Sequence, residues 1–93
     1  MLSFSSVARI ILAACPEAAR PNLYGFGSRL VSPIGNDFDV LLVSDTEEDI
    51  LAVKMALDTV GRDLPIDLTV LSPNELAETD FVAKWGCKHL DKI

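Results

Sequence analysis

Three aspartates and a glycine–serine pair are the residues of this chain whose types and spacing best suit chemistry. Asp37 and Asp39 stand two positions apart where an apolar run begins, and Asp67 is the second residue of a later apolar run. Carboxylate oxygens are ligands that Mg²⁺ prefers. Gly27 lets a backbone approach a phosphate closely, and Ser28 adds a hydroxyl and an amide. These residue types suit a triphosphate held through divalent cations.

The elements that must position these residues are indicated by hydrophobic patterning. Residues 22–26 predict a first strand, and residues 38–44 a second, whose near-continuous apolar run is typical of a strand covered by helices. Residues 66–71 predict a third strand. Residues 28–36 are predicted to form a loop, with Ser28 as an option for the start of a short helical turn whose amides favour anions.

Helices are predicted before, between and after these strands. The first is expected to begin at a cap on Ser5 or Ser6, and the second to run from a cap at Thr46 to near Gly61. Residues 72–75 supply a cap serine, a proline and a glutamate that begin a third helix. Beyond residue 79 the pattern weakens, and only docking of apolar side chains is expected. The predicted core-facing positions are Val7, Ile10, Ile11 and Ala14 on the first helix and Ile50, Val53, Leu57 and Val60 on the second. Phe81, Val82 and Trp85 are the tail residues expected to dock on the body of the protein.

The order of these elements predicts that the three aspartates meet at one edge of the sheet. The short connection between the first two strands favours an antiparallel pair, and the helical crossover to the third strand makes a parallel one. Asp37 and Asp39 then share a face, with Cα atoms about 7 Å apart, and Asp67 starts the neighbouring strand. Clustered carboxylates repel, so at least one should have a raised pKa. We expect two Mg²⁺ ions about 3.5–4 Å apart at this edge, with Arg29 as a further contact to phosphate.

Composition narrows the alternatives. The net charge of −6, from 14 acidic and 8 basic residues, disfavours direct binding of a nucleic acid backbone. His89 is the only histidine, so a zinc site with several histidines and Ser-His-Asp catalysis are both poorly supported. Cys15 and Cys87 lie far apart, which favours two reduced thiols and a cytoplasmic location. We expect one domain over residues 1–93 and no membrane span, which needs about 18 apolar residues.

The combined motif resembles the minimal nucleotidyltransferases of the DNA polymerase β superfamily. The resemblance rests on residues 23–29 (LYGFGSR), 36–43 (NDFDVLLV) and 65–70 (PIDLTV). The family's pattern has the same order: Gly-Ser, a short spacer, Asp-x-Asp followed by apolar residues, and a later Asp. The resemblance implies a polymerase β-like nucleotidyltransferase fold, which is an α/β fold with a mixed sheet and helices packed on it.

The resemblance also implies an activity, a cofactor and a partner. Gly27 and Ser28 would bind the triphosphate. Asp37 and Asp39 would ligate two Mg²⁺ ions, and Asp67 would bind the catalytic metal or help to deprotonate the acceptor hydroxyl. The reaction would move AMP from ATP to a hydroxyl. Small members of this family are commonly paired, as antitoxins, with a helical HEPN-domain ribonuclease toxin, so the acceptor is expected on such a partner protein.

Two departures from the family pattern and two alternatives accompany this hypothesis. Many relatives have Ala-Arg-Gly where this chain has residues 30–32 (LVS), and serine where it has Asn36, which can make the same local turn bond. The first alternative is a non-catalytic antitoxin module of the same fold that binds its partner without chemistry. The second is an α/β domain with solvated acids at a sheet edge. A polymerase is not expected, because these residues leave no room for a template domain, and a homo-oligomer stays open.

Overall fold

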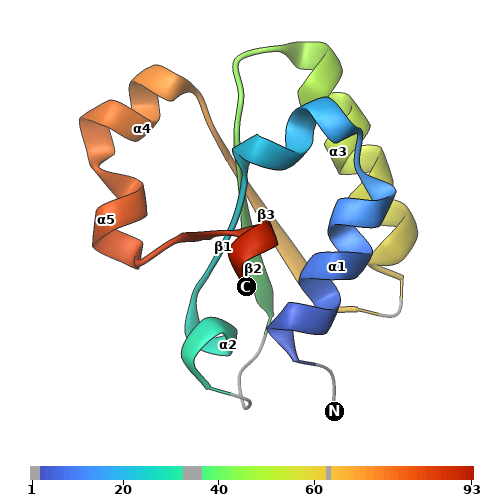
Figure 1. Ribbon diagram of the computed structural model, residues 1–93. Coiled ribbons are helices and arrows are strands. Elements are labelled where there is room, and N and C mark those ends of the chain that lie inside the picture. Colours follow the sequence, from blue (N-terminus) through green and yellow to red (C-terminus); the bar gives the residue numbers. More distant parts are fainter. Residues whose placement is uncertain (1–2, 33–36, 63) are drawn as a thin grey trace.

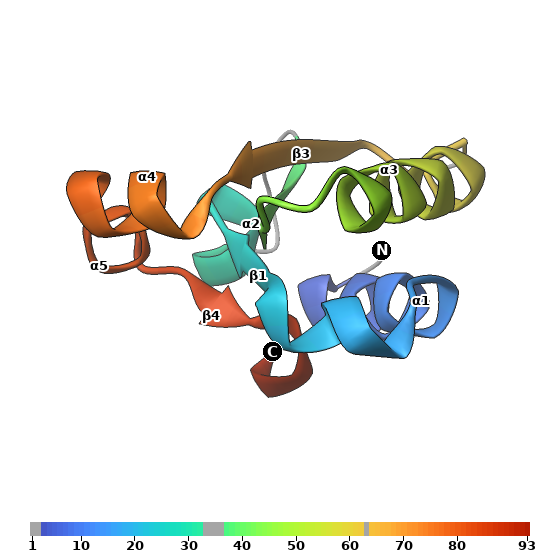
Figure 2. The ribbon, with the colours of Figure 1, turned by 90° about the horizontal axis from the view of Figure 1, so that it is seen from above.

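A mixed sheet with strand order β3-β2-β1-β4 forms the centre of the computed structural model, which describes residues 3–32, 37–62 and 64–93 (Figure 1). Helices lie on both faces of this sheet (Figure 2), which confirms the α/β class. The helices are α1 (Phe4–Ala14), α2 (Ser28–Val31), α3 (Glu47–Val60), α4 (Pro73–Thr79) and α5 (Phe81–Trp85), and the 3₁₀ helices are η1 (Glu17–Asn22) and η2 (Leu90–Lys92). The strands are β1 (Leu23–Phe26), β2 (Phe38–Val43), β3 (Ile66–Leu71) and β4 (Lys88–His89).

Strand pairing agrees with the predicted topology. β1 and β2 are antiparallel, and Phe26 lies opposite Asp39. β2 and β3 are parallel, and Asp39 lies beside Asp67. β4 adds a short antiparallel pairing on the other side of β1, in which Tyr24 lies opposite His89. This fourth strand was not predicted, because two exposed polar residues carry no hydrophobic pattern.

The two faces of the sheet differ in how they are covered. On the face toward α1 and α3, called here the core face, β1 and β2 present Leu23, Val40 and Leu42, all fully buried in one large apolar cluster. Because side chains alternate along a strand, Phe26, Asp39 and Leu41 point to the opposite side, called here the aspartate face. Figure 2 shows α4 and α5 on this second side. The phenyl ring of Phe26 contacts α5 at Phe81 and Trp85.

The first helix begins earlier than predicted. Its N-cap is Ser3, whose hydroxyl accepts a hydrogen bond from the backbone amide of Ser6, so the prediction of a Ser5 or Ser6 cap is wrong. The earlier start adds Phe4 to the helix. The side chain of Ile10 is 40% exposed; its placement in the core was therefore wrong, and the same holds for Ala14. The buried residues of α1 are Phe4, Val7, Ala8 and Ile11, which follow the expected helical spacing with its starting point moved.

The other helices match the sequence pattern more closely. α3 begins after Thr46, although the Thr46 side chain makes no capping hydrogen bond, and it ends before Gly61. Ser72 and Glu75 form a complete capping box at the start of α4, as predicted. The predicted loop at residues 28–36 is only partly a loop, since α2 occupies its first four residues. Residues 33–36 lie outside the described residues.

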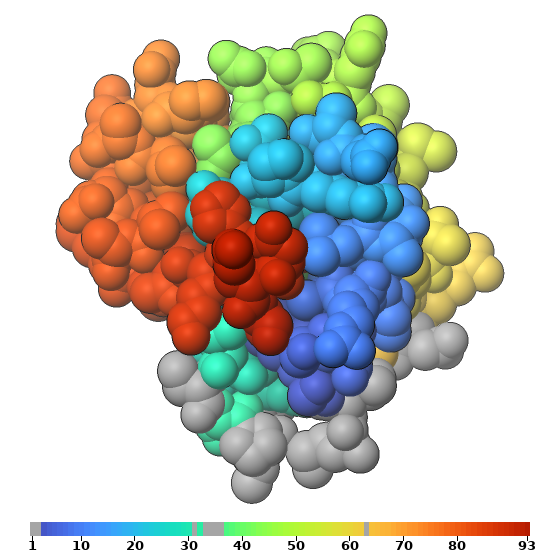
Figure 3. Space-filling view, viewed as in Figure 1, coloured from blue at the N-terminus to red at the C-terminus, as the bar shows by residue number. Residues whose placement is uncertain are grey.

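The C-terminal segment returns to the sheet after α5. Figure 3 shows it lying between α1 and the α4–α5 region. Leu90 is buried in the core cluster, and Ile93 packs against that cluster. Within the described part of the chain, no helix is both long enough and apolar enough to cross a membrane.

Candidate functional site

Three residues from neighbouring strands lie in one row across the sheet. Phe26 at the end of β1, Asp39 near the start of β2 and Asp67 near the start of β3 are successive partners across the strands. Partners in register point to the same face. Asp37 precedes β2 by one residue, and its side chain is exposed. The predicted meeting of the aspartates at one sheet edge is thus present in the backbone.

Asp39 is the most perturbed acid of this group. Partial burial raises the pKa of its carboxyl, and the negative charges of Asp67 and Asp37 raise it further. The raised pKa has the predicted direction, although burial contributes more to it than the predicted repulsion between the aspartates. A carboxylate that is costly to ionise in the free protein is one that a cation stabilises, because a cation replaces the lost hydration and screens the neighbouring acids.

The backbone of Gly27 lies so close to the Asp39 side chain that no larger residue fits at position 27 unless that side chain moves. A Cβ added at Gly27 would overlap the carboxylate of Asp39, and the Gly27 φ of 89° is one that other residues rarely adopt. This geometry explains the glycine without a ligand, since the Asp39 side chain itself occupies the space. The same contact places the Gly27 backbone directly beside the central carboxylate of the row.

Ser28 and Arg29 follow Gly27 in the short helix α2, with different outcomes. Ser28 is exposed at the first helical position, next to the aspartate row along the chain. The guanidinium carbon of Arg29 lies 4.0 Å from the centroid of the Phe38 ring, whose edge packs on Phe4 of α1. In this conformation Arg29 points to the core face, and its predicted contact with phosphate stays a prediction.

The three carboxylates lie at one edge of the sheet, but their side chains are not arranged around a single metal position. Among the residues that the structure describes, no three His, Cys, Asp or Glu side chains are arranged to hold a metal ion, and this includes Asp37, Asp39 and Asp67. Mg²⁺ requires oxygen ligands at about 2.0–2.1 Å. The strands therefore bring three carboxylates to one edge of the sheet. Binding of one ion by all three would require their side chains to turn toward one another.

An aromatic cluster beside the aspartate row was missed as part of the site. The Phe26 ring centroid lies 5.2 Å from that of Phe81 and 6.3 Å from that of Trp85. Phe81 and Trp85 themselves are stacked, with centroids 5.7 Å apart. Their spacing of four residues in one short helix was the available signal, since residues at i and i+4 lie on one side of a helix. Docking of both side chains on the body of the protein is confirmed.

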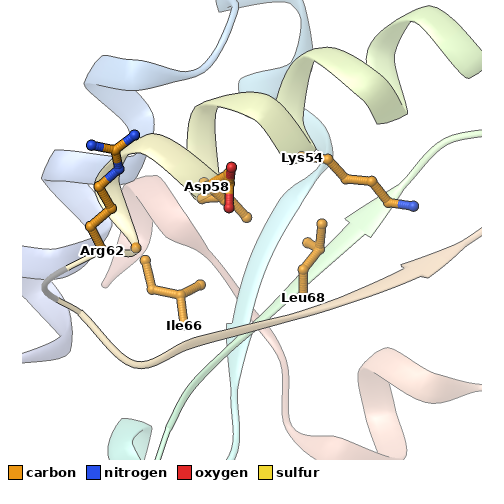
Figure 4. Close-up of a pocket in the computed structure, with 7 residues that line it drawn as sticks. Lys54, Asp58, Arg62, Ile66 and Leu68 are labelled. Atoms are coloured by element: carbon orange, nitrogen blue, oxygen red, sulfur yellow. The ribbon is translucent and has the colours of Figure 1, made fainter.

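An open pocket of about 360 Å³ lies elsewhere, between α3 and β3 (Figure 4). Ile66 and Leu68 form part of its floor, and both belong to the core side of β3, opposite to Asp67. Figure 4 shows Lys54, Asp58 and Arg62 around it. None of the residues predicted for the site lines this pocket.

The two cysteines stand apart from this chemistry. Both Cys15 and Cys87 are free, as predicted. Burial raises the pKa of each thiol, which disfavours the reactive thiolate. Neither residue therefore has the properties of a nucleophile.

Comparisons with known proteins leave the family open. The chain matches no protein family, no curated protein and no solved structure. The resemblance to minimal nucleotidyltransferases consequently rests on the three motif segments and on the strand pairing that connects them.

Proposed function

We propose that this chain is a Mg²⁺-dependent nucleotidyltransferase with a polymerase β-like fold. The observation that carries the proposal is the row in which Asp39 lies beside Asp67 on a parallel strand while the Gly27 backbone lies against the Asp39 carboxylate. This is the arrangement that the motif order demands. The donor set fits Mg²⁺, because all three acids are hard oxygen ligands and one of them is destabilised when ionised.

The proposed reaction transfers AMP from ATP to a hydroxyl. The hydroxyl oxygen attacks the α-phosphorus, the bond from that phosphorus to the bridging oxygen of the pyrophosphate breaks, and pyrophosphate leaves. Mg²⁺ held by Asp37 and Asp39 would supply charge neutralisation for the phosphates. Asp67 would accept the proton of the attacking hydroxyl or bind metal, as the resemblance implies. Ser28, exposed beside Gly27, offers a hydroxyl to the phosphates.

The acceptor in this proposal is a hydroxyl of a partner protein. The resemblance implies a HEPN-type toxin as that partner, with this chain as its antitoxin. The net charge of −6 supports a protein acceptor over a nucleic acid one, because an acidic chain repels a phosphate backbone.

The decisive experiment uses ATP labelled at its α-phosphate. With Mg²⁺ and a purified HEPN-domain protein as the acceptor, the wild type should transfer label to protein and release pyrophosphate, whereas γ-labelled ATP should transfer none. Asp39→Asn should abolish transfer, because it removes the central carboxylate without changing the size of the side chain. Asp45→Asn, which removes an exposed acid at the far end of β2, is the matched control and should keep full transfer. Near-normal transfer by Asp39→Asn would refute the metal assignment.

A second candidate function is a partner-binding module without catalysis. It is favoured by Leu51 and Met55, which are 60% and 62% exposed and lie one turn apart on α3. In that case the purified pair should form a stable complex that neither Mg²⁺ nor ATP affects, and Asp39→Asn should neutralise the partner as well as the wild type does.

A further inference from the structure

Trp85 has a position and an exposure that packing alone does not require. It is the only tryptophan of the chain, and 59% of its surface is exposed although it lies at the end of a short helix packed on the sheet. Large apolar side chains exposed beside a polar site commonly mark a binding surface. The Phe81 ring stacks on the indole ring, and the Phe26 ring meets it at an interplanar angle of 65°.

The aromatic cluster continues directly from the proposed phosphate and metal site. Phe26 is the cross-strand partner of Asp39, and the next residue along the chain is Gly27. The Phe26 ring therefore lies on the same face of the sheet as Asp39, and it also contacts the ring of Trp85. A triphosphate bound at Gly27 and Ser28 would leave its nucleoside within reach of α5, because the two features are separated by a single aromatic side chain.

We propose that Trp85, supported by Phe81 and Phe26, is the platform on which the nucleobase of the nucleoside triphosphate stacks. This inference rests on the proposed function and names the part of the site that binds the base. A stacking platform accepts any base, since each base has a π face, and it therefore supplies affinity with little choice between purines. The polar chemistry of the aspartate row would then act on the phosphates alone.

The single tryptophan makes the platform directly observable. Titration of the purified chain with ATP in the presence of Mg²⁺ should quench the Trp85 fluorescence in a saturable manner. Inorganic tripolyphosphate with Mg²⁺ carries the phosphates without a base and should leave the fluorescence nearly unchanged. Quenching of the same size by tripolyphosphate would overturn the platform, because the indole would then report the phosphates or a change of the fold.

Calorimetric dissociation constants provide the second measurement. Trp85→Ala should weaken ATP binding about tenfold, the size expected for one base–aromatic stack, and should leave tripolyphosphate binding unchanged. Trp85→Phe should retain most of the affinity for ATP. Ile10→Ala removes an exposed apolar side chain from α1, which lies on the other face of the sheet, and is the control, with no expected effect. Equal weakening of both ligands by Trp85→Ala would assign Trp85 a structural role and overturn the proposal.

Failure of the platform and failure of the proposed function give different results. If Trp85→Ala binds ATP as the wild type does while Asp39→Asn loses ATP binding, the platform is wrong and the nucleotidyltransferase proposal stands. If the wild type binds neither ATP nor tripolyphosphate in Mg²⁺, both proposals are wrong.

Discussion

The two faces of the sheet are built for different purposes. On the core face, Val40 and Leu42 of β2 are fully buried among the side chains of α1 and α3. On the aspartate face, the alternate residues of the same strand are Asp39, Leu41 and Val43, of which only Leu41 is fully buried. One strand thus carries an apolar row on one side and a row that begins with a charge on the other.

This difference separates the face that stabilises the fold from the face that carries the proposed site. The core cluster contains residues from α1, α3, η2 and the sheet, so its burial is the main favourable term for folding. Asp39 contributes in the opposite direction, because partial burial and two neighbouring acids disfavour its ionised form. The apolar face therefore offsets the cost of ionising Asp39, and residues whose charged form is disfavoured are common at functional sites.

Substitution of two adjacent leucines on β2 should give the largest effect that tests this comparison. Leu41 and Leu42 are both 0% exposed but point to opposite faces. Leu42→Ala should lower the free energy of unfolding by about 3–5 kcal/mol, because the large cluster around it cannot collapse into the cavity, and Leu41→Ala by about 2–3 kcal/mol, because a smaller and partly exposed layer relaxes more easily. Urea unfolding of the two variants measures the difference.

The comparison would fail if Leu41→Ala cost as much as Leu42→Ala or more. In that case the helices α4 and α5 would contribute to the core as strongly as α1 and α3. Conversely, nucleotide binding should be retained by any Leu42→Ala protein that is still folded, since Leu42 points away from the aspartates.

Addition of Mg²⁺ should raise the free energy of unfolding only through the carboxylates of the aspartate face. In the proposed site the ions would bind the ionised cluster of the native state and not the unfolded chain, so stability should increase by about 2.7 kcal/mol at a hundredfold excess over the dissociation constant. The double variant Asp37→Asn/Asp39→Asn should lose this response, whereas Leu41→Ala should keep it. Thermal melts at neutral pH, with NaCl at matched ionic strength as the reference, provide the measurement. An equal Mg²⁺ response of the wild type and the double variant would show that the acids form no site.

The fold was predictable where the local pattern and the tertiary contacts agree. β3 has the predicted bounds of residues 66–71, because Pro65 and the Ser72 capping box limit the strand on both sides. α1 was shifted because Ser3, Ser5 and Ser6 all suit an N-cap, and burial of a residue before Val7 decides among them. β4 had no local signal, since its two residues are fixed only by pairing with β1.

The candidate site was predictable at the level of the backbone and less so for side chains. Strand direction alone brings Asp39 and Asp67 to the same end of the sheet, because the first two strands are antiparallel and the helical crossover makes the third parallel to the second. The register that sets the two residues side by side is seen only in the structure. The rotamers that would direct all three carboxylates to one ion are not specified by the strands, and Arg29 has an aromatic ring available on the core face. A long cationic side chain can reach several partners, and the spacing of residues in the sequence does not tell which of them it will contact.

The smallest expected effect concerns the charge of Asp39 in the metal-free protein. Its pKa is raised in the native state, whereas the ordinary value for an aspartate is about 3.9. Between these two values the native state binds more protons than the unfolded state, so the free energy of unfolding falls as the pH rises through this window and then stays low above it. Asp39→Asn removes this contribution. The variant should therefore be more stable than the wild type at pH 7 without Mg²⁺, and the advantage should shrink once the pH falls below about 4.

Urea unfolding in EDTA at several pH values measures this effect, and Asp45→Asn controls for the loss of one negative charge from an acidic chain. The control should change stability little, because Asp45 is exposed and lies at the opposite end of β2. A wild type more stable than Asp39→Asn at neutral pH would mean that favourable contacts hold the ionised carboxylate in place. Asp39 would then stabilise the fold, and the contrast between a stabilising core face and a destabilising aspartate row would be wrong.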